Sequence, residues 1–234
     1  MRIVLVGHGT ANPAGQDVGW RIRDEVAARL PGVDVAWAWV DVARPRLADV
    51  LTPASDQVVV PVFLASGYHV RTDLPAIIAA AGGRARVTPA VGPELIGAVA
   101  DRLRTAETAS GQIADAVVLG AAGTTSAAAA GEVAVTADQL AERLRRPVGV
   151  GFVSAATPRL GEAITQARSR YGSDAVIAIA TWLLAPGHFH DQLGLAGADL
   201  VAEPIADHPL LVETVLRRVR EAAGPVLPRL GAVG

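Results

Sequence analysis

The chain has 234 residues, of which 51% are hydrophobic and 19% are charged, and its formal net charge is -2. It contains no cysteine and no lysine, so all 21 basic residues are arginines. These absences exclude disulfides, thiolate catalysis, cysteine metal sites, Schiff-base chemistry and a P-loop lysine. Catalysis by this chain must therefore depend on histidine, carboxylates, hydroxyls and arginine.

The charge pattern and the start of the chain predict where the protein acts. No run of like charge occurs, which argues against nucleic acid or an anionic membrane as a partner. The first apolar run, residues 3–6, is shorter than a signal peptide core or a membrane-spanning helix. We expect a cytoplasmic protein.

In the first half of the chain, strand-like apolar runs alternate with helical patterns. Short runs rich in β-branched residues predict strands over residues 3–6, 33–40, 58–64 and 84–88. Between the first two runs, apolar residues recur at every fourth position, which predicts a helix with one buried face: Val18, Ile22, Val26 and Leu30. This alternation predicts an α/β fold with a mainly parallel sheet flanked by helices.

The second half repeats this plan. Strands are predicted over residues 116–119, 148–153 and 175–180, and Val212, Leu216 and Val219 form the apolar stripe of a closing helix. Three segments of the first half also align with three of the second, in the same order and at a nearly constant offset. They are Val6–Thr10 with Gly120–Thr124, Asp41–Leu47 with Ser154–Leu160, and Phe63–Gly67 with Leu183–Gly187. We infer an internal duplication with domains over residues 1–108 and 113–234, joined in the polar stretch 106–112.

Polar residues follow the first three predicted strands. They are His8, Asp41 and His69. Ligands of such sheets bind outside the carboxyl ends of the strands, and neighbouring strands lie about 4.8 Å apart. The three side chains are therefore expected at one rim, where two imidazoles and a carboxylate make either a metal site or an acid–base site.

The second half has lost these three groups together. The duplication places Ala122, Ser154 and Phe189 at the positions of His8, Asp41 and His69. This joint loss is expected if the three residues act as a unit that only one half needs. His188 and His190 remain as a possible contribution of the second half, because residues two apart share a face in an extended segment and can form a second metal site or an opposing wall.

Two segments of the first half carry a family resemblance. Val6-Gly7-His8-Gly9-Thr10 followed by Asn12-Pro13, and Phe63-Leu64-Ala65-Ser66-Gly67-Tyr68-His69-Val70 followed by Asp73-Leu74-Pro75, resemble the two signature segments of the sirohydrochlorin chelatases. These are the class II tetrapyrrole chelatases, and long members of the family are fused duplications. The resemblance implies two chelatase-like domains, the first with the active site and the second with a degenerate copy.

The resemblance also implies roles for individual residues. His8 and His69 correspond to the catalytic, metal-binding histidines, and Asp41 lies where the family usually carries a glutamate as a third catalytic group. Ala11 stands where many members have an arginine. The second signature supplies the expected substrate-binding residues Leu64, Ala65, Ser66, Gly67 and Tyr68. Arg44 and Arg71, which follow two of the site-bearing strands, are expected to join them because guanidinium groups can pair with substrate carboxylates.

The function implied is the insertion of a divalent metal, Fe²⁺ first and Co²⁺ next, into sirohydrochlorin in siroheme or cobalamin biosynthesis. The metal is then a substrate, no permanently bound cofactor is expected, and Arg44, Arg46 and Arg71 are available to pair with the carboxylates of the tetrapyrrole. One alternative is a protein that carries metal or tetrapyrrole without turnover. Another is a phosphohistidine phosphatase or mutase, which the Gly7 that precedes His8 disfavours because that class carries an arginine there.

Overall fold

The computed structural model describes residues 1–52, 56–65, 72–82 and 85–224. Within them the chain forms two parallel, four-stranded sheets, with strand orders β2-β1-β3-β4 and β6-β5-β7-β8. In both sheets the first strand along the chain lies between the second and the third. The two sheets therefore share one topology, which confirms the predicted fold class and the duplication.

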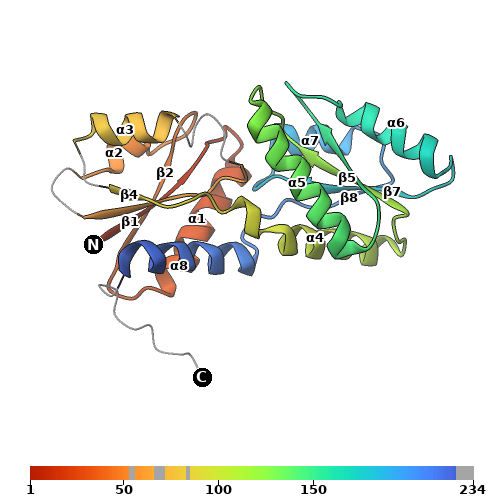
Figure 1. Cartoon of the computed structure of the whole chain (residues 1–234). Helices are drawn as coiled ribbons and strands as arrows, with labels where there is room; N and C mark the ends of the chain where they lie inside the picture. The colour runs from red at the N-terminus through yellow and green to blue at the C-terminus, as the bar shows by residue number, and fades with distance from the viewer. Residues whose placement is uncertain (53–55, 66–71, 83–84, 225–234) are drawn as a thin grey trace. The chain divides into compact units, whose positions relative to one another are not determined.

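The first compact unit comprises the described parts of Met1–Gly92 and Asp207–Gly234. Its strands are β1 (Arg2–Gly7), β2 (Asp34–Trp39), β3 (Gln57–Pro61) and β4 (Ala85–Val87). Its helices are α1 (Pro13–Ala28), α2 (Leu47–Val50), α3 (Leu74–Ala80) and α8 (Pro209–Ala223). Helices α1 and α8 cover one face of the sheet, and α2 and α3 cover the other (Figure 1).

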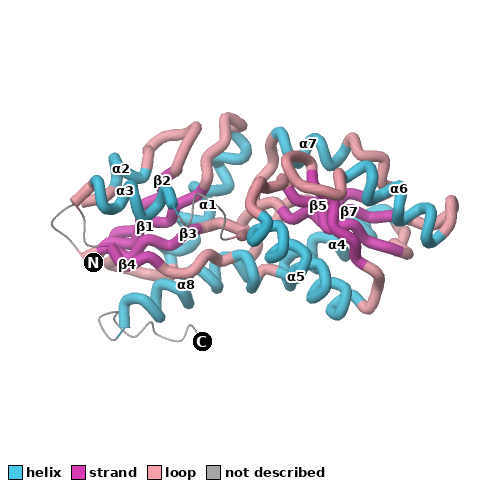
Figure 2. Tube along the Cα trace, turned by 45° about the horizontal axis from the view of Figure 1, so that its top comes forward, coloured by secondary structure: helices cyan, strands magenta, loops and turns pink. Residues whose placement is uncertain are grey.

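The second compact unit is Pro93–Ala206. Its strands are β5 (Ala116–Ala121), β6 (Val148–Phe152), β7 (Ile177–Trp182) and β8 (Leu200–Val201). Its helices are α4 (Ile96–Ser110), α5 (Ala127–Leu144), α6 (Leu160–Tyr171) and α7 (His188–Gly194). Figure 2 shows α6 and α7 on one side of β5 and β7, and α4 and α5 on the other.

The two repeats exchange their closing helices. Helix α4 comes at the end of the first repeat but packs against α5, β7 and β8 of the second unit, while α8 packs against α1 and β3 of the first unit. The compact units therefore differ from the predicted sequential domains 1–108 and 113–234. Periodicity identifies the apolar stripe of a helix but does not say which sheet that stripe will cover, which is why the sequence did not reveal the exchange.

The predicted joint between the halves also needs correction. Residues up to Ser110 belong to the last turns of α4, which ends at Gly111 with a φ of 70°. Only the segment after Gly111 connects this helix to β5. The polar stretch 106–112 resembles a linker because Thr108 and Ser110 are exposed on the last turn of α4, whereas Glu107 points inward and is buried.

Side-chain caps explain where helices α1 and α5 begin. The Asn12 side chain accepts hydrogen bonds from the N–H groups of Ala14 and Gly15, and Pro13 starts α1 without a free N–H. Ser126 caps α5 in the same position of the second repeat. None of the helices in the described ranges combines the length and the apolarity needed to span a membrane.

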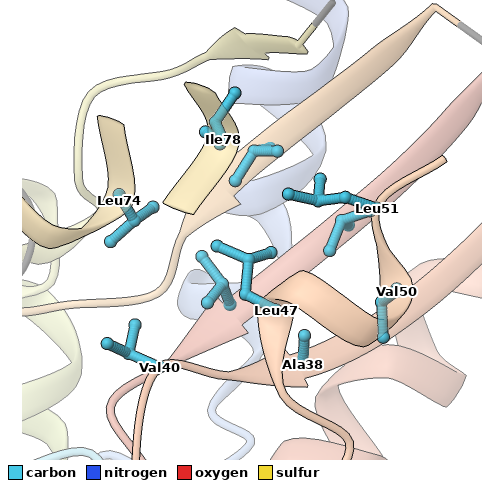
Figure 3. Close-up of a cluster of buried hydrophobic side chains, with 10 residues drawn as sticks. Ala38, Val40, Leu47, Val50, Leu51, Leu74 and Ile78 are labelled. Atoms are coloured by element: carbon cyan, nitrogen blue, oxygen red, sulfur yellow. The ribbon is translucent and has the colours of Figure 1, made fainter. Parts of the chain in front are cut away.

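A cluster of aliphatic side chains anchors the loops at one edge of the first sheet. It joins β1 and β2 to α2 and α3, and Figure 3 shows Val40, Leu47, Leu74 and Ile78 pointing into a shared interior. Val40 and Leu47 border the segment 41–46, and Leu47 is fully buried. Burial of these two residues fixes both ends of a short loop, and apart from the buried Ala43 the loop residues are exposed or half-buried.

Candidate functional site

The site lies at the carboxyl ends of β1 and β2. These strands pair in parallel from Arg2↔Asp34 to Gly7↔Trp39, so the residues that follow them leave the sheet side by side. The Asp41 N–H donates to the His8 carbonyl oxygen at 2.9 Å. The structure thus brings together two of the three residues expected at this rim, and the third, His69, lies outside the described residues.

Two tryptophans support the rim from below. Trp37 and Trp39 of β2 are buried, and their ring centroids lie 5.1 Å apart in an edge-to-face arrangement. A Cβ at Gly7 would lie 2.9 Å from Trp37 and 3.0 Å from Trp39, so only glycine lets β1 pack this closely on both rings. The end of β1, and with it His8, is therefore held by the core of the first unit.

Gly9 brings the two loops into direct contact. Its φ is 116°, and a Cβ at this position would lie 1.8 Å from the carbonyl oxygen of Asp41. No residue with a side chain fits this contact without moving the backbone of Asp41. Gly9 thus sets the spacing between the His8 and Asp41 loops.

The carboxylate of Asp41 is held by a backbone donor and a cation. Val42 has a φ of 62°, unusual for a β-branched residue, and its N–H bonds to the carboxylate. Arg46 Nη1 lies 3.2 Å from Asp41 Oδ1. The Val42 N–H first, then Arg46 and to a smaller extent His8, hold the pKa of Asp41 below its ordinary value. Asp41 is therefore an ionised, oriented base at neutral pH.

His8 presents an exposed imidazole beside this carboxylate. Its Nδ1 lies 3.3 Å from the Gly9 carbonyl oxygen, which can only accept a hydrogen bond. A proton on Nδ1 serves that contact and places the lone pair of the neutral ring on Nε2. Such a nitrogen can take a proton or bind a divalent ion.

The predicted substrate-binding residues divide into three groups. Arg44 Nη1 lies 3.3 Å from Asp49 Oδ2, so this arginine is paired with the first turn of α2, although it remains largely exposed. Leu64 and Ala65 follow β3 and are half-buried, and the Leu64 backbone packs against Gly92. The remaining members fall outside the described residues: Ser66, Gly67, Tyr68 and Arg71.

The second unit has the same backbone frame as this site, meaning the same loop contacts and turns, but it lacks the ionisable side chains of His8 and Asp41. The Ser154 N–H donates to the Ala122 carbonyl oxygen at 2.9 Å, and a Cβ at Gly123 would lie 1.8 Å from the Ser154 carbonyl oxygen. Gly123 and Ala155 have φ angles of 115° and 57°, close to those of Gly9 and Val42. The predicted alignment of the Asp41 and Ser154 segments therefore agrees with the backbone geometry of both loops.

His188 and His190 do not lie in an extended segment, contrary to expectation. They form the first turn of α7, where residues two apart point in different directions. His188 is exposed, whereas His190 is half-buried and its Nε2 has no hydrogen-bond partner among the described residues. The two imidazoles therefore do not share one face, as they would in an extended segment.

The described residues also contain a cavity away from this rim. Its volume is about 260 Å³, and it is lined by β5, β6 and α6, with Gln166, Arg170 and Tyr171 supplying the larger polar groups. It borders the amino-terminal halves of β5 and β6 rather than their carboxyl ends. Among the described residues no three histidine, aspartate or glutamate side chains gather closely enough to hold a metal ion.

Comparison with known proteins identifies the family. The CbiX family model matches the chain twice, over residues 2–106 and 116–222. The chain belongs to the CbiX family. This confirms the resemblance to sirohydrochlorin chelatases in their long, duplicated form. Both copies of the CbiX match include a helix, α4 or α8, that packs on the unit formed mainly by the other copy.

Curated relatives and solved structures agree with membership of the CbiX family. Sirohydrochlorin cobaltochelatases of Methanosarcina barkeri and Methanosarcina acetivorans are each 32% identical over 81 residues, which cover 32% of this chain and 62% of the relative. The structure of SirB from Bacillus subtilis with Fe³⁺ matches 98% of this chain and 99% of its own, with a TM-score of 0.77 and 20% identity. A CbiX described as the terminal enzyme of siroheme biosynthesis in denitrifying bacteria matches 96% of this chain and 100% of its own, with a TM-score of 0.72 and 20% identity. These structures share the fold over nearly the whole chain.

Proposed function

We propose that this CbiX-family protein is a sirohydrochlorin chelatase, a lyase that inserts a divalent metal into the tetrapyrrole. The observation that carries the proposal is the contact between the His8 and Asp41 loops at the ends of β1 and β2. The curated relatives named as cobaltochelatases support it, although the matched region spans 62% of their length. The same frame in the second unit carries Ala122 and Ser154 instead, so the reaction is assigned to the first unit.

The chemistry of insertion suits this pair of groups. The metal dication replaces two pyrrole N–H protons, so the site must accept protons and release an ion that it first binds. Neutral His8 can bind the ion or take a proton, and ionised Asp41 can relay protons or help to hold the ion. His69 completes the proposed set. Two imidazoles and one carboxylate leave coordination positions open, which favours transfer of the metal to the macrocycle.

The choice between Fe²⁺ and Co²⁺ remains part of the proposal. Nitrogen and oxygen donors accept both ions, so the residues expected at the site do not separate them. The sequence expectation places Fe²⁺ first, whereas the relatives from Methanosarcina are named as cobaltochelatases. The assay below therefore uses both metals, and the ratio of the two kcat/KM values ranks them.

The decisive experiment follows the absorbance of sirohydrochlorin under anaerobic conditions with Fe²⁺ or Co²⁺ and substoichiometric protein. We expect wild-type protein to accelerate the spectral change over many turnovers. Replacing a proton-accepting or metal-binding group should lower the rate by about 10²-fold or more, so His8→Ala, His69→Ala and Asp41→Asn are expected to be nearly inactive. The matched control is Ser154→Ala, which alters the equivalent position of the second unit and should retain wild-type activity.

Three outcomes decide between this function and the alternatives. Stoichiometric binding of metal or tetrapyrrole without turnover would identify a carrier. Turnover that survives His8→Ala and His69→Ala would refute the site while leaving the chelatase activity. Hydrolysis of a generic phosphate ester that depends on His8 would favour the phosphatase alternative.

A further inference from the structure

Arg46 differs from the other arginines near the site in having Asp41 as its partner. The Arg46 guanidinium contacts Asp41 Oδ1 at 3.2 Å, whereas Arg44 contacts Asp49 at 3.3 Å. The sequence made Arg46 available to pair with a carboxylate of the tetrapyrrole, whereas neither the family match nor the signature segments assign it a role toward Asp41. The question is whether this contact is an incidental surface ion pair or part of the site.

The backbone of Arg46 is fixed independently of its side chain. Arg46 forms an isolated parallel bridge with Trp39, the last residue of β2, and the Trp39 N–H donates to the Pro45 carbonyl oxygen at 3.0 Å. The Arg46 N–H donates to Asp49 Oδ2 at 3.2 Å, and the next residue, Leu47, is fully buried in the cluster of Figure 3. The guanidinium therefore reaches Asp41 from a rigid base.

The backbone of Asp41 is equally restrained. Its N–H donates to His8, its carbonyl oxygen accepts from the Ala43 N–H at 2.6 Å, and Gly9 packs against that same carbonyl oxygen. Only rotation of the side chain remains free. Among the described residues, the Val42 N–H and the Arg46 guanidinium restrict this rotation.

The second unit provides an internal comparison. Arg159 occupies the equivalent position, with the equivalent bridge to Phe152, but Ser154 replaces the aspartate. There the guanidinium donates to the Val153 carbonyl oxygen at 3.0 Å, and the Ser154 hydroxyl donates to Ala122 at 2.8 Å. Among the described residues, the arginine at this position therefore pairs with a carboxylate only in the unit that carries His8.

We propose that Arg46 is a positioning residue for Asp41: it holds the carboxylate in one orientation and lowers the attraction of this rim for a divalent cation. This inference rests on the proposed function, in which the ion must be bound and then released. A carboxylate already engaged by a guanidinium has fewer oxygen lone pairs to offer a metal. The positive charge of Arg46 also repels the incoming ion, so the site holds its metal substrate weakly.

The effect on metal binding can be given a size. A unit charge about 6 Å from a divalent ion in water changes the ion's affinity by about tenfold, and salt reduces this to a few-fold. Arg46→Gln is therefore expected to bind Co²⁺ about three- to tenfold more tightly than wild type. It should also show a lower kcat with an unchanged KM for sirohydrochlorin, because the carboxylate is no longer fixed and the ion leaves more slowly.

The test measures the dissociation constant of Co²⁺ alone, by its visible absorption bands, and the kinetic constants of chelation, for Arg46→Gln, Arg46→Lys and the matched control Arg159→Gln. Arg46→Lys keeps the charge and is expected to restore the wild-type Co²⁺ affinity. Arg159→Gln should change neither Co²⁺ affinity nor kinetics. In an Asp41→Asn background, the fold-change that Arg46→Gln causes in the residual kcat should be smaller, because ion release still depends on Arg46 but carboxylate orientation no longer does. Circular dichroism and thermal unfolding of each variant establish that it is folded.

Several results would overturn the proposal. A raised KM for sirohydrochlorin with unchanged kcat would make Arg46 a contact for a substrate carboxylate. An equal effect of Arg46→Gln in the Asp41→Asn background would show that it does not act through Asp41. An unchanged or weaker Co²⁺ affinity in Arg46→Gln would refute the repulsive role. Because Co²⁺ binding requires no turnover, a wild-type protein without chelatase activity would refute the proposed function and leave this test intact.

Discussion

A largely buried ion pair between Glu107 and Arg146 adds to the apolar packing that holds the exchanged helix α4 in the second unit. The Glu107 carboxylate also accepts the Ala114 N–H at 3.0 Å, and Arg146 donates to the Ala114 carbonyl oxygen at 3.0 Å. The side chains of Glu107 and Arg146 are only 9% and 20% exposed. We predict that Glu107→Ala destabilises the second unit more than any single change at an exposed ion pair.

The expected loss is worked from these contacts. Glu107→Ala leaves the buried Ala114 N–H without its acceptor, which costs about 1–3 kcal/mol. It also removes the partner of a largely buried guanidinium, a change that costs about 3–5 kcal/mol when the charge is fully enclosed. Arg146 keeps its hydrogen bond to the Ala114 carbonyl oxygen and some access to water, so the total loss of unfolding free energy should be about 3 kcal/mol. Glu107→Gln keeps an acceptor for Ala114 and should lose about half as much.

The measurement is hydrogen exchange resolved along the chain, combined with urea unfolding. Protection should fall in β7, against which α4 packs, more than in β1 of the first unit. Asp101→Asn is the matched control, since Asp101 pairs with Arg104 on the same helix but both side chains are exposed, and its loss should stay below about 0.5 kcal/mol. A loss in Glu107→Ala no larger than in Asp101→Asn, or an equal loss of protection in both sheets, would refute the reasoning.

Three further predictions concern the glycine turns, acid stability and the helix exchange. Gly9→Ala and Gly123→Ala place a Cβ 1.8 Å from a backbone carbonyl oxygen at φ above 110°, so each should lower the free energy of unfolding in urea by about 2–4 kcal/mol. In the fraction that stays folded, only Gly9→Ala should lower the rate of chelation. Equal chelation rates of the two variants would contradict this prediction. Burial raises the pKa of Glu107, but hydrogen bonds from Arg146 and Ala114 lower it overall, so its contribution to stability is present above about pH 4 and is lost as the pH falls further. Thermal unfolding between pH 6 and about pH 2 should show this decline, and Glu107→Gln should flatten it; parallel curves would exclude Glu107 as a cause. Cleavage after Gly111, in an exposed turn, should give two fragments that fold only when mixed, because α4 and α8 each cover the sheet formed mainly by the other repeat. Cooperative unfolding of either fragment alone would disprove this dependence.

Much of the fold can be read from local patterns in the chain. All seven predicted strands are present within a few residues; the third ends at Pro61 rather than at residue 64, and the last begins at Ile177 and continues to Trp182. Short apolar runs, fourfold spacing and helix caps act within a few residues of one another, so they are visible without the fold. The two-residue strand β8 carries too few residues to show a pattern and was not predicted.

The candidate site was predicted in its outline but not in its geometry. The α/β pattern predicts a parallel sheet, so His8 and Asp41 were expected to lie close together if their strands were neighbours, and the structure shows that β1 and β2 are paired. The pairing of Arg46 with Asp41 did not follow, because it depends on the positive φ of Val42 and on the turn that returns Arg46 to β2. A proline and arginine at the same place in both repeats, Pro45-Arg46 and Pro158-Arg159, were the available signal.

Local sequence thus specifies the duplication, most of the strands, the glycine turns and the polar residues at the strand ends, because each depends on neighbours a few positions away. The exchange of α4 and α8 depends on competition between surfaces distant in the chain, whereas the pairing of Arg46 with Asp41 depends on the backbone turn between them, which returns Arg46 to β2. Two similar repeats offer two similar sheets to each closing helix, and only packing in three dimensions selects between them. The absence of lysine and cysteine, evident from the start, narrowed the chemistry to imidazole, carboxylate and guanidinium, and the fold brings one of each together at the rim of the first unit.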